Sequence, residues 1–170
     1  MSATTELLGT IAATGDDTAK VTFERHYDTD AADLWSAVTT PERLRRWFAP
    51  VAGDLRPGGT FTIHFNDGDV PKCTLETCDA PRAFSWVWPH DGQTSHIAVT
   101  VATDGAGSRL RLVHSRLPKD KAPEYGAGWQ AFVRSLDTHL TADTDPREGA
   151  WWEEFHAVRG GYAEALAEVG

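Results

Sequence analysis

The sequence is poor in cysteine. Only two of its 170 residues are cysteines, Cys73 and Cys78, five positions apart in a segment that alternates like a strand. An odd spacing points two strand side chains to opposite faces, so these thiols cannot bridge each other. Neither cysteine has the neighbours of a metal ligand. We therefore expect two free thiols in a reducing compartment, which excludes a disulfide-stapled scaffold.

Long apolar runs are also missing. No stretch approaches the roughly 18 to 20 uninterrupted apolar residues of a membrane helix. The first residues, MSATTELLGTIAATGDD, carry neither the basic start nor the apolar centre of a signal peptide. We therefore expect a cytoplasmic protein without a membrane partner.

Basic residues are outnumbered. Sixteen lysines and arginines stand against 25 aspartates and glutamates, which leaves a formal net charge of -9. Such a charge repels polyphosphate backbones, and the one local basic patch, formed by Arg43, Arg45 and Arg46, is small. We expect no nucleic-acid partner.

The remaining composition is that of a folded domain, with 41% hydrophobic and 24% charged residues. Residues 20–28 alternate as a strand. One short helix is predicted over 30–38 with Asp30 as its N-cap. A second begins at Thr40, whose hydroxyl should cap it, and ends at Pro50.

From residue 51 to residue 116, turn signals recur about every 8 to 12 residues, which predicts five or six antiparallel strands. A long helix is predicted near 121–141, with Trp129, Val133, Leu136 and Leu140 on its apolar stripe.

The last segment, 147–169, has the pattern of an amphipathic helix. Its apolar residues recur at steps of three and four: Trp151, Phe155, Val158, Tyr162 and Leu166. The pair Gly160 and Gly161 predicts a break in this helix. The apolar stripe must be covered, either by the chain's own domain or by a second copy in a homodimer.

The segment LWSAVTTPERLRRWFAP at 34–50 resembles the VW-x-ALT-x-PE-x-L-x-x-W signature of the SRPBCC (START-like, helix-grip) superfamily. In particular it resembles the branch of bacterial homologues of the heat-shock-protein ATPase activator. Later blocks resemble that branch in the same order: GGTF at 58–61, PRAFSW at 81–86, SRLRLVHSRLP at 108–118 and GWQAFVRSLDTHL at 128–140. The resemblance spans residues 20–140.

The resemblance implies an α+β helix-grip fold. A curved antiparallel sheet wraps around a long C-terminal helix, two short helices follow the first strand, and a cavity between sheet and helix is usually apolar. Residues 1–141 are then a START-like helix-grip domain, and 142–170 a C-terminal amphipathic helical extension outside the resemblance. The superfamily includes carriers, receptors, cyclases and chaperone activators, so the fold does not imply a reaction.

Aromatic residues from several predicted elements can converge between sheet and helix if the alternation holds: Trp47, Phe65, Trp86, Trp88, Trp129 and Phe132. Such a lining suits a flat apolar ligand, because ligand pockets are mostly apolar and aromatic. The alternative is ordinary core packing.

Two polar residues, His114 and Arg25, each lie on the apolar face of a predicted strand. His114 has the parity of Leu110 and Leu112, so it either bonds a polar group of a ligand or is a core histidine bonded to the backbone. Arg25 either binds an anionic ligand group or makes a structural ion pair. The histidines His64, His96 and His114 lack metal-ligand spacing, so we expect no metal and no cofactor.

These residues favour non-catalytic binding of a small hydrophobic or aromatic molecule in the cavity. One alternative is an enzyme of cyclase or isomerase type, in which Arg25 or His114 polarises a carbonyl. The other is a protein-interaction module similar to the chaperone activators. The sequence contains no nucleophile elbow and no phosphate-binding loop, so no catalytic residue is assigned.

Overall fold

The computed structural model describes residues 6–65, 68–90, 93–142 and 149–169. Within these residues, eight strands form one antiparallel sheet in the order β1-β2-β8-β7-β6-β5-β4-β3. The strands are β1 (Gly9–Ala13), β2 (Thr18–Tyr27), β3 (Val51–Gly53), β4 (Thr60–Ile63), β5 (Lys72–Asp79), β6 (Ala83–His90), β7 (Gln93–Asp104) and β8 (Gly107–Pro118). The helices are α1 (Ala31–Thr39), α2 (Pro41–Trp47), α3 (Ala122–Ala142) and α4 (Ala150–Val169). The predicted α+β class and the antiparallel sheet are confirmed.

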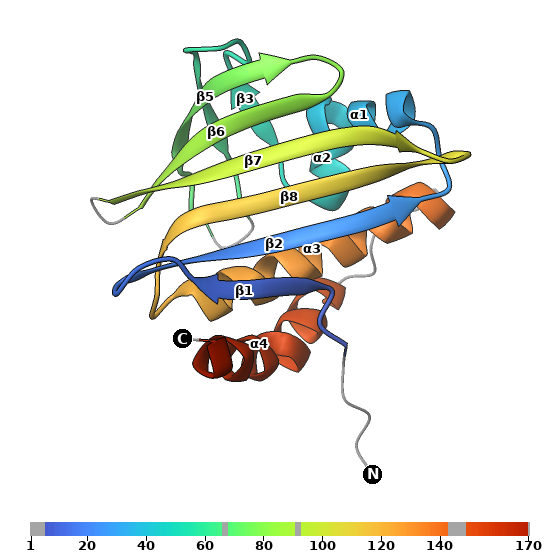
Figure 1. Ribbon diagram of the computed structural model, residues 1–170. Coiled ribbons are helices and arrows are strands. Elements are labelled where there is room, and N and C mark those ends of the chain that lie inside the picture. The colour runs from blue at the N-terminus through green and yellow to red at the C-terminus, as the bar shows by residue number, and fades with distance from the viewer. Residues whose placement is uncertain (1–5, 66–67, 91–92, 143–148, 170) are drawn as a thin grey trace.

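The sheet curves around α3, as Figure 1 shows. The long helix lies across one face of the sheet, with α4 beside it next to β1, and with α1 and α2 toward the opposite end. The inner face of α3 buries Trp129, Val133 and Leu136, while Leu140 is half-buried. This is the predicted stripe, and it places the core between sheet and helix.

Strand β2 shows how the alternation builds this arrangement. Val21, Phe23 and Tyr27 are buried on the face toward the helices, whereas Glu24 and His26 are exposed. Arg25 lies on the buried face and is paired in register with Leu110 of β8. The inward parity predicted for Arg25 is therefore correct.

Three local predictions are wrong. No strand is predicted at β1, because the small residues of GTIAA weaken the alternation, and in the structure only Ile11 of this strand is buried. Thr40 occupies the N-cap position of α2, yet its side chain makes no capping hydrogen bond. By contrast, Asp30 caps α1 as predicted, accepting a hydrogen bond from the Asp33 backbone N–H at 2.7 Å.

The third error is the break expected at Gly160 and Gly161, since α4 runs through both glycines without interruption. A Cβ atom built on Gly161 would lie 3.0 Å from Leu7 Cδ2. The glycine therefore lets Leu7 pack closely against the helix, and this tertiary contact offsets the low helix propensity of glycine.

The two cysteines are free, with Cys73 buried and Cys78 exposed, as the odd spacing predicts. Burial, assisted by the negative charge of Asp69, raises the pKa of Cys73 to about 12, so this thiol stays protonated at neutral pH. Among the described residues, no group of three His, Cys, Asp or Glu side chains is arranged to hold a metal ion. No helix of the described part of the chain has the length and apolar character needed to cross a membrane.

Candidate functional site

Aromatic rings from the sheet, α2 and α3 meet in one cluster. We call it the aromatic cluster and define it as Trp47, Phe48, Phe65, Trp86, Trp88, Trp129 and Phe132. The structure thus brings together all six aromatic residues that the sequence analysis proposed. It adds Phe48, the C-cap residue of α2.

Trp88 lies at the buried centre of this cluster. Its ring stacks on Trp86 at a centroid distance of 5.3 Å and on Phe65 at 5.7 Å. It also stacks on the His114 imidazole at 5.4 Å, with an interplanar angle of 17°. Trp86 and Trp88 are only 5% and 7% exposed, because alternation along β6 turns both rings toward α3.

His114 is held by a chain of hydrogen bonds. The indole N–H of Trp129 donates to His114 Nδ1 at 2.9 Å. Because an indole nitrogen only donates, Nδ1 carries no proton and the neutral ring has its proton on Nε2. His114 Nε2 then donates to Ser95 Oγ at 2.7 Å, and Ser95 Oγ donates to the Trp88 carbonyl at 3.2 Å. With no exposed surface, His114 has the geometry of a core histidine.

The outer part of the site is half-buried. Four rings lie there, which we call the outer rings: Phe48, Phe65, Phe132 and Trp151. Phe132 of α3 connects them, with centroid distances of 4.8 Å to Phe48, 6.1 Å to Phe65 and 5.4 Å to Trp151 of α4. The ring contacts continue from Trp151 to Phe155 and to Trp152, and Trp152 is 53% exposed. A continuous aromatic path therefore runs from the core to the surface of α4.

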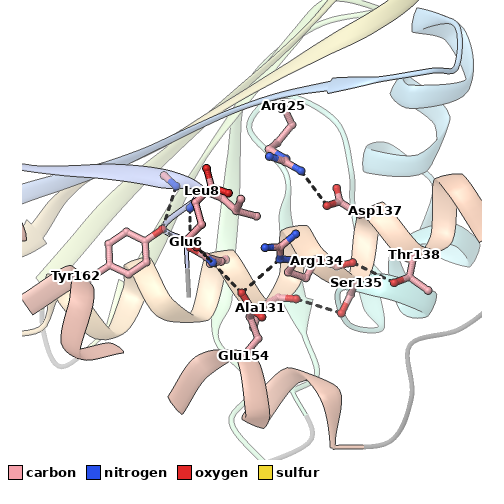
Figure 2. A network of polar contacts seen from close by, with 12 residues as sticks. Glu6, Leu8, Arg25, Ala131, Arg134, Ser135, Asp137, Thr138, Glu154 and Tyr162 are labelled. Carbon is pink, nitrogen blue, oxygen red and sulfur yellow. Dashed lines mark hydrogen bonds and ion pairs between the residues drawn. The ribbon is translucent and has the colours of Figure 1, made fainter. Parts of the chain in front are cut away.

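Arg25 lies apart from these ring contacts and makes an ion pair. Its Nη2 donates to Asp137 Oδ2 of α3 at 3.0 Å, and both side chains are about a quarter exposed, at 26% and 23%. Figure 2 shows Arg25 reaching from β2 down to Asp137. Of the two roles considered for Arg25, this contact is the structural ion pair. Tyr27 lies near the pair, and burial, together with the charge of Asp137, raises its pKa.

A second polar group joins α1 and α2 to the end of α3. Arg43 Nη1 donates to the Asp33 carboxylate at 2.8 Å, and Arg43 Nε donates to His139 Nε2 at 3.1 Å. Partial burial acts to raise the pKa of the Asp33 carboxyl. The hydrogen bonds from Thr29 and Arg43 and the charge of Arg43 outweigh burial and keep this pKa below its usual value.

The outer face of α3 is bound to α4 and to the chain before β1 by a network around Gln130. Figure 2 labels four residues of this network, which are Glu6, Leu8, Glu154 and Tyr162. The Gln130 side-chain oxygen accepts hydrogen bonds from Leu8 N–H at 2.9 Å and from Tyr162 O–H at 2.8 Å. Its nitrogen donates to the Glu6 carbonyl at 2.8 Å and to Glu154 Oε2 at 2.7 Å. Gln130 is fully buried, and these four hydrogen bonds use both lone pairs of its amide oxygen and both hydrogens of its amide nitrogen.

A groove of about 420 Å³ opens elsewhere, between the start of α3 and the middle of α4. It is lined by Asp120, Pro123, Glu124, His156, Arg159, Gly160 and Ala163. This charged lining includes none of the residues predicted to contact a ligand, so the groove is a separate surface feature.

Sequence reasoning missed several residues of the site. Phe48 is absent from the predicted ligand residues, although it directly follows Trp47. Trp151 was assigned only to the C-terminal stripe. Nothing in the local pattern identifies Ser95 or Gln130, because their partners lie 19 and 32 residues away in the chain at His114 and Tyr162.

The curved sheet around a long helix, with two short helices between β2 and β3, is the helix-grip fold. Residues 28–141 match the family described as activator of Hsp90 ATPase homolog 1-like protein, and the chain belongs to that family. The predicted resemblance is confirmed. No curated protein sequence matches the chain.

Solved structures share this fold. The crystal structure of CalU16 from Micromonospora echinospora is 25% identical, with a TM-score of 0.76, and the match covers 95% of this chain and 96% of CalU16. DynU16, described as a protein in the dynemicin biosynthetic locus, is 21% identical, with a TM-score of 0.70 over 77% of this chain and 49% of DynU16. The Aha1 dimer from Colwellia psychrerythraea is 19% identical, with a TM-score of 0.64 over 71% of this chain and 95% of Aha1.

Proposed function

We propose that the protein binds a small, flat hydrophobic or aromatic molecule at the aromatic cluster, without catalysing a reaction. The observation that carries this proposal is the set of four half-buried outer rings from α2, the end of β4, α3 and α4. Aromatic rings bury large areas and stack on flat partners in offset or edge-to-face geometry. The outer rings supply the ligand contacts, and the buried rings behind them hold these rings in place.

The hydrogen bonds of His114 and Arg25 support a binding function more than a catalytic one. A residue that polarises a carbonyl needs a donor directed at the substrate. Both ring nitrogens of His114 are already hydrogen-bonded within the protein, and Arg25 is paired with Asp137. In the proposed function His114 therefore supports Trp88 and Trp129, and Arg25 fixes α3 against β2.

Two further considerations support a small-molecule partner. DynU16 belongs to a biosynthetic locus, where small organic molecules are made. The cluster is also uncharged, which suits a neutral ligand in a chain of net charge -9. The cytoplasmic location remains a prediction, and so does the homodimer.

Native mass spectrometry of freshly purified protein tests the proposal directly. A bound small molecule adds its own mass to the protein, and the same spectrum shows whether the chain is a monomer or a dimer. Titration with 2-acetylnaphthalene should then change tryptophan emission, because Trp88 and Trp151 lie in the site, and should raise the melting temperature by mass action.

A matched pair of variants locates the binding site. Phe132→Leu removes the ring that connects the outer rings, so we expect weaker binding of 2-acetylnaphthalene. Phe84→Leu removes a half-buried ring that packs against Trp35, at 5.6 Å, and should leave binding unchanged. Equal binding by both variants, or no response of the wild type to a panel of aromatic ligands, would overturn the proposal.

A protein-interaction role is the second candidate, favoured by the family description itself. It predicts that the protein stimulates the ATPase of an Hsp90-type chaperone and that aromatic ligands have no effect on it. An unchanged chaperone ATPase rate, together with a ligand-dependent melting temperature, decides for the first proposal.

A further inference from the structure

Two indole N–H donors of the aromatic cluster are satisfied within the protein. Trp47 Nε1 donates to the Ala37 carbonyl at 2.9 Å, and Trp129 Nε1 donates to His114 at 2.9 Å. Trp151 differs from both. Its Nε1 atom is out of contact with solvent and, in the part of the chain that the structure describes, has no hydrogen-bond partner.

An indole N–H without an acceptor is unfavourable in a buried position, because folding removes its hydrogen bond to water and supplies none in return. Such groups are rare in folded proteins and often mark the place where a ligand or solvent molecule binds. A molecule that brings an acceptor to Trp151 gains this hydrogen bond without displacing a partner of the indole.

Trp151 is placed within the proposed site. Its ring contacts the outer ring Phe132 and stacks on Phe155 with an interplanar angle of 13°. It also lies over Gly128 of α3, where a Cβ atom would be only 3.5 Å from Trp151 Cζ2. The indole is thus held between α3 and α4 at the edge of the aromatic cluster.

We propose that the Trp151 indole N–H orients the bound molecule, so that the ligand is a neutral aromatic compound with a carbonyl oxygen. This inference rests on the proposed function. The family match ends at residue 141, before α4 begins. The N–H is therefore a specificity contact supplied by the last helix, outside the residues that match the family model.

The test compares two ligands of similar shape, 2-acetylnaphthalene and 2-ethylnaphthalene, by calorimetric titration. Both affinities are measured in the wild type and in Trp151→Phe. The ratio of the ketone's affinity to that of the alkyl compound should be larger in the wild type. We expect the ratio of the two affinities to fall about threefold to tenfold in this variant, the worth of one hydrogen bond. Trp152→Phe changes the exposed neighbour and should keep the wild-type ratio.

Nuclear magnetic resonance gives a readout that needs no variant. The indole N–H proton of Trp151 should shift downfield when the ketone binds and should not do so with the alkyl compound. Binding of both ligands with the same affinity ratio in wild type and Trp151→Phe would overturn the inference and leave the proposed function intact. Failure of the wild type to bind either ligand would overturn the proposed function itself.

Discussion

The two faces of α3 are stabilised in different ways. The face toward the sheet buries Trp129, Val133 and Leu136 among aromatic and aliphatic side chains. The face toward α4 buries Gln130, whose amide bonds two backbone groups and two side chains. One helix therefore meets the sheet through apolar area and meets α4 and the chain before β1 through directed hydrogen bonds.

The difference has a physical reason. Apolar burial is non-directional, so the inner face tolerates many side chains of suitable size and shape. A buried amide is favourable only when its partners stand at the correct distance and angle, so the outer face fixes the position of α4 and of the chain before β1. Tyr162 takes part in this fixing, and burial raises its pKa, which keeps its hydroxyl protonated as a donor to Gln130.

The largest effect is expected on the inner face. Leu136 has no exposed surface, so Leu136→Ala should lower the free energy of unfolding by about 2 to 5 kcal/mol through lost burial and the cavity left behind. Chemical denaturation followed by circular dichroism measures this. Leu140→Ala, at a half-buried position of the same stripe, should cost less, and an unchanged midpoint for Leu136→Ala would contradict the packing of α3.

On the outer face, Gln130→Met should lower the free energy of unfolding by about 1 to 3 kcal/mol. The methionine has a similar volume but leaves the Leu8 N–H and the Tyr162 hydroxyl without their acceptor. Arg134→Met is the control, because the Arg134 to Glu154 contact is 3.4 Å long and partly exposed. Equal stability of both variants would show that the network does not fix α4.

Alanine substitutions at two helix glycines test whether α4 packs closely against α3 at Gly126 and leaves open space at Gly160. A Cβ atom on Gly126 would lie 2.9 Å from Tyr162 Cδ1, so Gly126→Ala must push α4 away and should cost about 1 to 2 kcal/mol after the gain in helix propensity. Gly160 has open space around its Cβ position, so Gly160→Ala should stabilise by up to about 1 kcal/mol. Opposite shifts in melting temperature are expected, and a shared direction would refute the close approach at Gly126.

The smallest effect concerns pH. The pKa of the Asp33 carboxyl is lowered in the folded state, so its contribution to stability is present above the unfolded pKa and is lost as pH falls through the folded value. Because this side chain is 42% exposed, the contribution should stay below about 1 kcal/mol. Asp33→Asn should therefore narrow the difference between urea midpoints at pH 6 and pH 3.5, relative to the wild type.

Much of the inner face could be predicted from the sequence. Alternation in β2, β6 and β8 identified the buried side of each strand, and the three- and four-residue steps of α3 identified its stripe. These predictions succeed because periodicity depends only on neighbouring residues of one element. The same reasoning brought Trp88, Trp129 and Phe132 into one cluster, since inward residues of a curved sheet must face the helix it wraps around.

The outer face could not be predicted in this way. β1 is too short and too rich in small residues for its alternation to stand out, and Gly160 with Gly161 indicated a break that Leu7 packing removes. Gln130 gave no signal, because a lone glutamine on a helix is usually solvated, and its partners come from two distant segments, the chain before β1 and α4.

The sequence by itself determined the class of fold, the helices and strands between residues 20 and 140, and the aromatic character of the core. These follow from local periodicity and from family motifs. Only the tertiary structure decided that His114 is bonded through both ring nitrogens, that Arg25 pairs with Asp137, and that the Trp151 N–H is buried without a partner among the described residues. Each of these facts depends on distances between groups far apart in the chain, and a hydrogen bond exists only when such distances are met.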